Sequence, residues 1–153
     1  MLKDLHCELF PAHTRAPLKY VIVCSRYQGQ WLLSKHRQRD TWETQGGHIE
    51  PGETPQDAAS RELYEESGVA DASLFYVCDY LGTNGDRWSN GAVFFADVHV
   101  LGEMPQSEME ATRLFPSLPE NLTYPLVTPV VIHECCKFMH SQCDSSETSH
   151  PRG

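Results

Sequence analysis

The sequence contains no apolar run close to the roughly 20 residues that a membrane-spanning helix requires. Its first residues, MLKDLHCELF, lack the order of basic and then apolar residues that begins a secretory signal. No segment repeats, and the composition does not shift at the scale of a domain. These absences argue against a membrane protein, a secreted protein and a repeat protein, and by default we expect a cytoplasmic location.

Paired metal-binding or disulfide-forming residues are also absent. The six cysteines form no Cys-x-x-Cys pair, and the eight histidines form no His-x-x-x-His pair. A disulfide framework and a structural zinc site are therefore not expected. Cys24 lies in an apolar run, and we expect it to be a small core residue.

Basic residues are scarce. The chain has 12 Lys and Arg against 21 Asp and Glu, which gives a formal net charge of −9. Such a charge argues against a dedicated nucleic-acid surface, because phosphate backbones are bound mainly through Lys and Arg. An acidic protein can still accept a phosphate-bearing small molecule if divalent cations bridge the two.

The 153 residues, of which 40% are hydrophobic, suit one domain with a real core. We predict a single α+β domain over residues 1–140 and a polar, disordered tail over residues 141–153. Residues 1–17 are expected to form an edge strand or an irregular lead-in. The stretch TNGDRWSNG and residues 102–123 are expected to be loops, and residues 36–53 a loop with short strand pieces. Strands are predicted at residues 18–24, 31–34, 72–81 and 91–101, and a carboxy-terminal helix at residues 127–140.

The best-marked element is a helix that ends at Ser67. Thr54 is suited to the N-cap, Pro55 to the first helical position, and Asp57 to the third residue of a capping box. Gly68 supplies the residue that follows the last turn of many helices. The sequence therefore predicts both ends of this helix.

The same helix carries carboxylates at helical spacing. Glu62, Glu65 and Glu66 project from one narrow arc, because residues three and four apart share a face. Like charges at these spacings repel one another, and Arg61 is the helix's only basic residue. One interpretation is a solvated acidic face. The other is a site for a hard divalent cation such as Mg²⁺, which binds carboxylates, waters and substrate phosphates together.

A longer pattern surrounds these glutamates. Residues 47–53 read GHIEPGE, and after seven further residues the chain continues as RELYEESGV over residues 61–69. This pattern matches the sequence box of the Nudix hydrolases at every defining position. The chain therefore resembles that family, and the order of its expected elements fits the family over about residues 18–140.

The resemblance implies an α/β/α sandwich with a mixed β-sheet, in which the box binds Mg²⁺ or Mn²⁺. It also implies that water attacks a phosphorus of a nucleoside diphosphate linked to another group, with the cations lowering the pKa of the water. Arg61 would hold Glu53 in place, and Glu65 would be a metal ligand or the catalytic base. The metal ligands implied by the resemblance are Gly47, through its carbonyl, Glu62, Glu65 and Glu66.

One position departs from the family. Its members commonly carry proline before the paired glycines, whereas this chain has Gln45 before Gly46 and Gly47. Proline would stiffen the backbone there, and glutamine instead adds a donor and an acceptor. The metal ligands are unchanged, so we expect activity to be retained.

A further carboxylate near the metals is expected from a loop beyond the sheet, as in many Nudix enzymes. The segment that contains Glu103, Glu108 and Glu110 is the candidate. We favour Glu108 as ligand or general base, with Glu110 next. The alternative for both is an ordinary surface carboxylate.

The box does not determine which group leaves in the reaction, so the substrate must be inferred from residues outside the box. The remaining sequence resembles MutT-type nucleoside triphosphatases of Gram-positive bacteria, which include enzymes that hydrolyse 8-oxo-dGTP to the monophosphate. We therefore expect a nucleoside triphosphate, with an oxidised or an ordinary purine, as the leading small-molecule substrate. ADP-ribose, a nucleotide sugar or the 5′ end of RNA are alternatives, as is a sensor that binds a nucleotide without turnover. A homodimer is left open.

Residues that could bind the substrate lie on both sides of the box. Arg37 and Arg39, with Lys35 and His36, precede it and could hold phosphates, although a solvated basic loop is an equal alternative. Base stacking and base-edge recognition need aromatic and amide groups. The candidates for these roles are Trp88, Asn90, Phe94 and Asn121. Each has a structural alternative, namely an exposed loop aromatic for Trp88, a core residue for Phe94 and a turn cap for Asn121.

Overall fold

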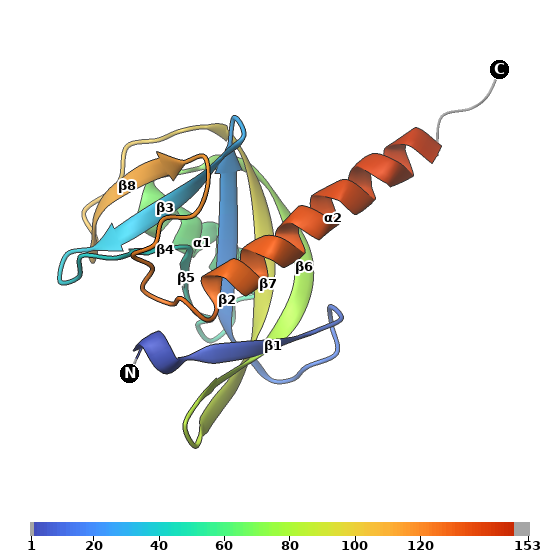
Figure 1. Ribbon diagram of the computed structural model, residues 1–153, viewed down its shortest axis with the longest axis horizontal. Coiled ribbons are helices and arrows are strands. Elements are labelled where there is room, and N and C mark those ends of the chain that lie inside the picture. The colour runs from blue at the N-terminus through green and yellow to red at the C-terminus, as the bar shows by residue number, and fades with distance from the viewer. Residues whose placement is uncertain (1, 149–153) are drawn as a thin grey trace.

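A mixed eight-stranded sheet forms the centre of the fold (Figure 1). The structure, a computed structural model, describes residues 2–148. The hydrogen-bonded strand order is β1-β6-β7-β2-β3-β4, with β5 paired to β2 and β8 paired to β3. β2 runs parallel to β7, and the other pairs are antiparallel. The strands are β1 (His6–Phe10), β2 (Leu18–Tyr27), β3 (Gln30–His36), β4 (Trp42–Glu43), β5 (Gln45–His48), β6 (Asp71–Asn84), β7 (Arg87–Val100) and β8 (Met109–Phe115).

Two helices, α1 (Pro55–Ser67) and α2 (Thr128–Thr148), cover opposite faces of the sheet, and a short 3-10 helix spans Leu2–Asp4. Side chains alternate along a strand, so neighbours in β2 face different helices. Val21 and Val23 pack with Leu63 of α1, whereas Cys24 packs with Val131 of α2. The predicted α+β fold, with a mixed sheet between two helical layers, is confirmed.

The predicted ends of α1 are also confirmed. The Thr54 hydroxyl accepts a hydrogen bond from the Asp57 backbone N–H, and the Asp57 carboxylate accepts one from the Thr54 N–H, both at 3.1 Å. These contacts satisfy donors that the first turn leaves unpaired. Gly68 adopts φ +80° and its N–H donates to the Tyr64 carbonyl. The first turn and the last turn of α1 are thus fixed by residues adjacent to the box glutamates.

The sheet divides between β2 and β3. These strands pair with each other only near their hairpin, where Ser25–Tyr27 lie opposite Gln30–Leu32. Beyond that point β2 pairs with β5 and β3 pairs with β4, while β8 pairs with β3 from Trp31 to His36. We call this opening, between β2 before Ser25 and β3 after Leu32, the fork. The chain crosses the fork at Thr44, between β4 and β5, and β5 is thereby delivered to the edge nearest α1.

Two expected loops are wrong. The stretch TNGDRWSNG belongs mostly to strands, because β6 continues to Asn84 and β7 begins at Arg87. Gly85, at φ +64°, makes the turn between them. The hairpin extends away from the body of the sheet (Figure 1), so its polar composition reflects exposure to solvent rather than a loop. β8 lies within residues 102–123, and only Met109 and Phe115 at its ends are buried, which leaves too few apolar positions for a strand signal.

α2 is longer than predicted. It begins at Thr128 but continues to Thr148 instead of ending at His140. Residues 141–148 contain no glycine or proline, so no strong helix breaker stands in this polar segment. The disorder predicted for residues 149–153 lies outside the described residues. Across residues 2–148, none of the helices combines the length and the apolar character needed to cross a membrane.

Candidate active site

Two glycines bring the backbone of β5 against the carboxylates of α1. The Gly46 N–H donates a hydrogen bond of 2.8 Å to Glu66 Oε1. A Cβ added at Gly47 would lie 2.4 Å from Glu62 Oε1, and one added at Gly46 would lie 2.4 Å from the Val21 carbonyl oxygen. Such distances are far below van der Waals contact, so neither position accepts a side chain without movement. Gly47 is therefore required by the close approach of β5 to α1, and Gly46 by the close approach of β5 to β2.

Arg61 binds several acidic groups of the box at once. Its Nε and Nη2 donate to the two carboxylate oxygens of Glu53 at 2.7 and 2.9 Å, which is the expected pair. Its Nη1 lies 2.9 Å from Glu62 Oε1 and 3.3 Å from Glu65 Oε2. Its Nη2 also donates to the His48 carbonyl. The guanidinium thus connects the loop before α1, the end of β5 and the helix itself.

The carboxylates of the site have divergent pKa values. Burial raises the pKa of Glu66 to about 8, even though the Gly46 N–H favours its charged form, and the nearby charge of Glu62 raises it further. Burial also raises the pKa of Glu62, against the opposing effect of Arg61. The hydrogen bonds from Arg61 lower the pKa of Glu53 to about 2. Clustered, partly buried carboxylates of this kind are typical of functional sites.

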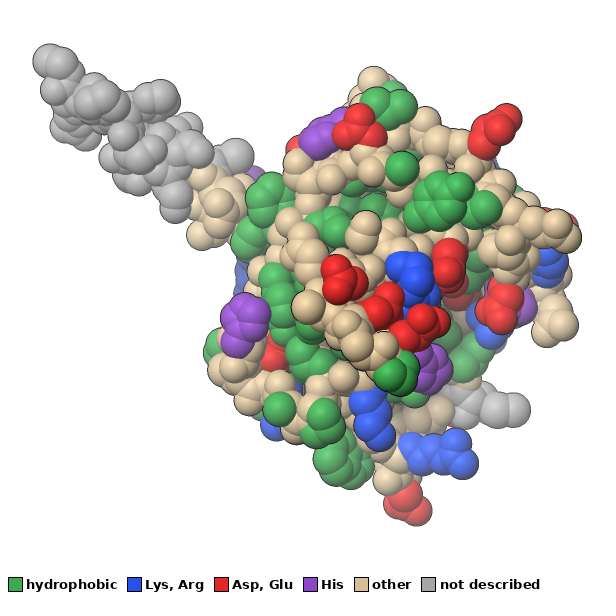
Figure 2. All heavy atoms as spheres, turned by 180° about the vertical axis from the view of Figure 1, so that it is seen from behind, with side chains coloured by type: hydrophobic (Ala, Val, Ile, Leu, Met, Phe, Trp, Pro, Cys, Tyr) green, Lys and Arg blue, Asp and Glu red, His purple; other side chains and the backbone are tan. Residues whose placement is uncertain are grey.

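Arg61, Glu62, Glu65 and Glu66 line an open depression of about 580 Å³ beside α1. The face drawn in Figure 2 shows acidic side chains gathered around a basic one. Glu108 lies at the rim of the depression with residues 105–107, and its side chain is 85% exposed. Glu110 instead forms an ion pair of 2.6 Å with Lys35, which lowers the pKa of that carboxyl. The structure therefore brings Glu108, rather than Glu110, to the box glutamates.

The donors of the depression suit a hard divalent cation. Carboxylate and carbonyl oxygens are the ligands that Mg²⁺ prefers, and Glu62, Glu65, Glu66 and the Gly47 backbone line this one space. Burial and the neighbouring charge of Glu62 raise the pKa of Glu66, so a bound cation would offset the cost of keeping that carboxylate charged. Among the described residues, no three His, Cys, Asp or Glu side chains already converge as a metal site. Glu62 and Glu65 are instead turned to Arg61.

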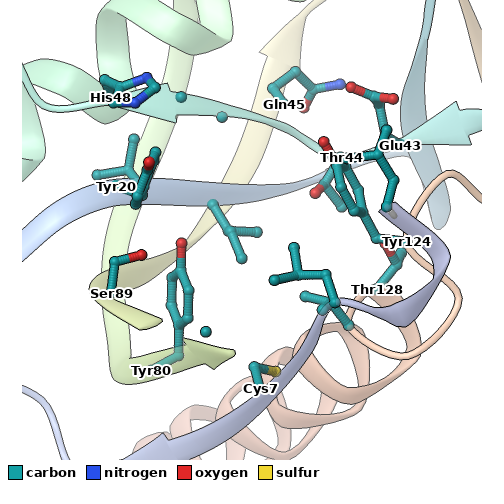
Figure 3. Close-up of a pocket in the computed structure, with 18 residues that line it drawn as sticks. Cys7, Tyr20, Glu43, Thr44, Gln45, His48, Tyr80, Ser89, Tyr124 and Thr128 are labelled. Atoms are coloured by element: carbon teal, nitrogen blue, oxygen red, sulfur yellow. The ribbon is translucent and has the colours of Figure 1, made fainter. Parts of the chain in front are cut away.

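A second cavity, of about 370 Å³, lies on the α2 side of the sheet (Figure 3). It shares Gly46, Gly47 and His48 with the depression, so β5 separates the two spaces. Burial raises the pKa of Tyr80, which keeps its hydroxyl a hydrogen-bond donor at neutral pH. Aromatic rings and hydroxyls line the cavity, supplied by Tyr20, Tyr80, Tyr124, Thr44, Ser89 and Thr128.

A third cavity, of about 410 Å³, adjoins the second and contains Trp88, which is 65% exposed. Leu5, Tyr20, Gly82 and Ser89 line both cavities. Lys19 and Arg87 bring positive charge to this one. Trp88 is thus the one predicted substrate residue that the structure places in a cavity next to the site.

The other predicted substrate residues have partners elsewhere. The Arg37 Nε donates to the Ser107 carbonyl at 3.0 Å, so this side chain holds the segment that carries Glu108. Arg39 pairs with Glu43 at 3.1 Å, and the Asn121 side chain donates to the Asp40 carbonyl at 3.1 Å. Asn90 binds the Arg15 side chain and two carbonyls, and Phe94 is fully buried in the core. These contacts match the structural alternatives more closely than a role in binding substrate.

The sequence did not point to the residues of the second cavity. Tyr20, Tyr80 and Tyr124 are far apart in the chain and gather only because β2, β6 and the segment before α2 meet there. The alternation along β2 could have placed Tyr20 on the face opposite α1, but no pattern indicates that this face contains a cavity. Glu43, buried at 6% exposure, was overlooked for the same reason.

Replacing each paired glycine with alanine should separate cation binding from folding. In Gly47→Ala the new methyl meets the flexible end of Glu62, so we expect Mn²⁺ affinity to fall about 10-fold or more with little loss of stability. In Gly46→Ala the methyl meets the Val21 backbone, so we expect the free energy of unfolding to fall by about 1–3 kcal/mol. Mn²⁺ titration and urea unfolding measure the two effects. Wild-type Mn²⁺ affinity in Gly47→Ala would contradict the close contact between Gly47 and Glu62.

Low pH should abolish the contribution that the Glu53–Arg61 ion pair makes to the free energy of unfolding. Because the pKa of Glu53 is lowered to about 2 in the folded protein, its charged form is favoured by folding. Its contribution is complete above the ordinary pKa, near 4.5, and is lost as the pH falls toward 2. We expect Glu53→Gln to be less stable than wild type at pH 6, with the difference shrinking below pH 4.5. Urea unfolding across this range tests it, and a difference that does not change with pH would rule out the charge effect.

Comparisons with known proteins agree with this geometry. A family model described as the NUDIX domain matches residues 16–124. The Bacillus subtilis protein named "Putative 8-oxo-dGTP diphosphatase YtkD" is 37% identical over 106 residues, which cover 69% of this chain and 66% of that protein. An RNA pyrophosphohydrolase of Photorhabdus laumondii is 43% identical over 49 residues, or 32% of this chain and 27% of that protein. The chain therefore spans no more than about two thirds of either relative.

A solved structure shows the same architecture. The crystal structure of the Bacillus subtilis pyrophosphohydrolase BsRppH superimposes with a TM-score of 0.73 at 27% sequence identity. The match covers 87% of this chain and 90% of that one. The family model extends over β2 to β8 and α1 and includes the whole box. The chain belongs to the Nudix hydrolase family.

Proposed function

We propose that this protein is a divalent-cation-dependent pyrophosphohydrolase that acts on a nucleoside 5′-triphosphate and releases the monophosphate and pyrophosphate. One observation carries the proposal. A carboxylate-lined depression and an aromatic cavity lie on the two sides of Gly46 and Gly47. A nucleotide can therefore place its base in the aromatic cavity and its phosphates at the carboxylates, across the edge of β5. The relative named as an 8-oxo-dGTP diphosphatase supports this substrate class.

The residues of the depression have distinct roles in this proposal. Glu62, Glu66 and the Gly47 carbonyl hold the cation, and Mg²⁺ and Mn²⁺ both suit these oxygens. When bound, the cation polarises phosphoryl oxygens and lowers the pKa of the attacking water. Glu65 or Glu108, both exposed to the depression, accepts the proton of that water. The water oxygen bonds to phosphorus as the anhydride bond breaks, and Arg61 keeps Glu53 and the loop in place.

The 5′ end of an RNA is a second candidate, because the third cavity adjoins the second. A mononucleotide fills one base cavity, whereas a chain presents another nucleotide close by. Trp88 supplies a stacking surface there, and Lys19 and Arg87 supply charge for a phosphate. The relatives named as RNA pyrophosphohydrolases support this candidate over their short region of similarity.

A hydrolysis panel distinguishes these substrates. Purified protein would be assayed with Mg²⁺ and with Mn²⁺ on 8-oxo-dGTP, dGTP, ATP, 5′-triphosphate RNA, ADP-ribose and a nucleotide sugar, with products separated by chromatography. We expect pyrophosphate from the triphosphates and no turnover after chelation of the cation. A kcat/KM for RNA above that for the mononucleotides would favour the second candidate. Turnover of ADP-ribose or the nucleotide sugar alone, or nucleotide binding without any turnover, would contradict the proposal.

Glu66→Gln should remove most of the activity and leave the fold intact. The amide keeps an acceptor for the Gly46 N–H but loses the charge that holds a cation, which is worth several kcal/mol to the transition state. We expect kcat to fall by about 100-fold or more, since each 1.4 kcal/mol is a factor of ten. Glu110→Gln, the same substitution at an exposed carboxylate outside the depression, is the matched control and should leave kcat unchanged. Near-normal rates in Glu66→Gln would show that the ligand assignment is wrong.

A further inference from the structure

Gln45, at the start of β5, closes the base of the fork. Its side chain is fully buried, at 0% exposure. Its Oε1 accepts a hydrogen bond from Ser25 Oγ at 2.6 Å, on the β2 side. Its Nε2 donates to the Leu32 carbonyl at 3.0 Å and to Ser34 Oγ at 2.9 Å, on the β3 side. The amide thus uses its acceptor and both donors to join the two strands where their own pairing ends.

The hydrogen-bonded chain continues from Gln45 to the catalytic helix. Because Ser34 Oγ accepts from Gln45, its single proton is free to donate, and it donates to the Glu66 carbonyl at 2.8 Å. Carbonyls in the last turn of a helix have no partner within the helix, and Ser34 supplies one here. Gln45 is therefore connected through one hydroxyl to the backbone of Glu66.

A second connection runs through the chain itself. Gly46 follows Gln45 directly, and its N–H donates to Glu66 Oε1 at 2.8 Å. Glu66 is thus held at its carbonyl by Ser34 and at its carboxylate by Gly46, and both partners are attached to Gln45. Figure 3 shows Gln45 at the start of β5, next to Thr44. A proline at this position would have no donor or acceptor in its side chain with which to make the same contacts.

We propose that Gln45 is a positioning residue for Glu66: its buried amide sets the distance between the β5 backbone and the last turn of α1, and so tunes the cation affinity of the site. The inference rests on the proposed function, because it assumes that Glu66 binds a cation. The competing explanation is that Gln45 only fills the base of the fork. On that explanation, losing any of its hydrogen bonds should affect stability alone.

Three variants distinguish a role of Gln45 in positioning Glu66 from a role in filling the base of the fork. Gln45→Met keeps the length of the side chain and removes every hydrogen bond of the amide. Ser34→Ala keeps Gln45 and removes the contact with the Glu66 carbonyl. Ser25→Ala is the matched control, because it removes an equally buried serine hydroxyl that donates to Gln45 and not to the Glu66 carbonyl. Each would be measured for Mn²⁺ affinity of the substrate-free protein by electron paramagnetic resonance of free Mn²⁺, for urea unfolding, and for kcat and KM.

We expect Gln45→Met and Ser34→Ala to weaken Mn²⁺ binding about 10-fold and to lower kcat with little change in KM, as substitutions next to metal ligands commonly do. Ser25→Ala should lower the unfolding midpoint and leave Mn²⁺ affinity unchanged. Unaltered Mn²⁺ affinity in Ser34→Ala, or an equal loss in all three variants, would overturn the inference. If Gln45→Met does not fold, the comparison of Mn²⁺ affinity between Ser34→Ala and Ser25→Ala is sufficient to test the inference. A wild-type protein that neither binds Mn²⁺ nor hydrolyses a nucleotide would contradict the proposed function instead.

Discussion

The geometry of the candidate site depends on how closely β5 approaches α1. A strand and a helix normally stand apart by the width of their side chains, but at Gly47 there is no strand side chain between β5 and Glu62 of α1, and at Gly46 there is none between β5 and the β2 backbone. The strand can therefore pair with β2 on one edge while its backbone contacts Glu62 and Glu66. The position of Arg61 follows from the same approach, since its guanidinium reaches the His48 carbonyl at the end of β5. Any side chain at Gly46 or Gly47 would alter these contacts together.

This close approach also makes the site two-sided. Only the thickness of one strand separates the carboxylates on the α1 side from the aromatic cavity on the α2 side. The two sides have opposite character, because one concentrates negative charge and the other presents tyrosine rings and hydroxyls. A nucleotide has the same division between its phosphates and its base. The match between these two divisions, more than any single contact, is the reason to propose a nucleotide as the substrate.

Much of α1 could be predicted from the sequence. Its caps are local, and Thr54, Asp57 and Gly68 each act on residues at most four positions away. The spacing of the glutamates is local in the same sense. The pairing of Arg61 with Glu53 needed the family resemblance, and the structure contains it. Such features can be predicted from the sequence because they depend on helical periodicity and on short-range hydrogen bonds.

The parts that escaped prediction depend on long-range packing. The second cavity needs Tyr20, Tyr80 and Tyr124 to meet from three distant segments. β8 is stabilised by pairing with β3 rather than by its own composition, and Arg37 is used to hold the segment of Glu108. Gln45 was recognised as a departure from the family, but its burial follows from the fork, which no local pattern reveals. Substrate residues outside the box are therefore better assigned from the cavities than from sequence.

The contacts of Arg61 have a consequence for how the site would accept a cation. The guanidinium already contacts Glu62 and Glu65, so an incoming cation would gain only the difference between its own attraction and that of the arginine. Affinity for the free ion is reduced by that competition, while the empty protein avoids the repulsion of bare carboxylates. A substrate with Mg²⁺ bound to its phosphates adds phosphate oxygens as further ligands. These ligands would favour the cation over Arg61 in the competition for the carboxylates. We therefore expect metal and nucleotide to bind cooperatively, with the resting protein stable in the absence of either.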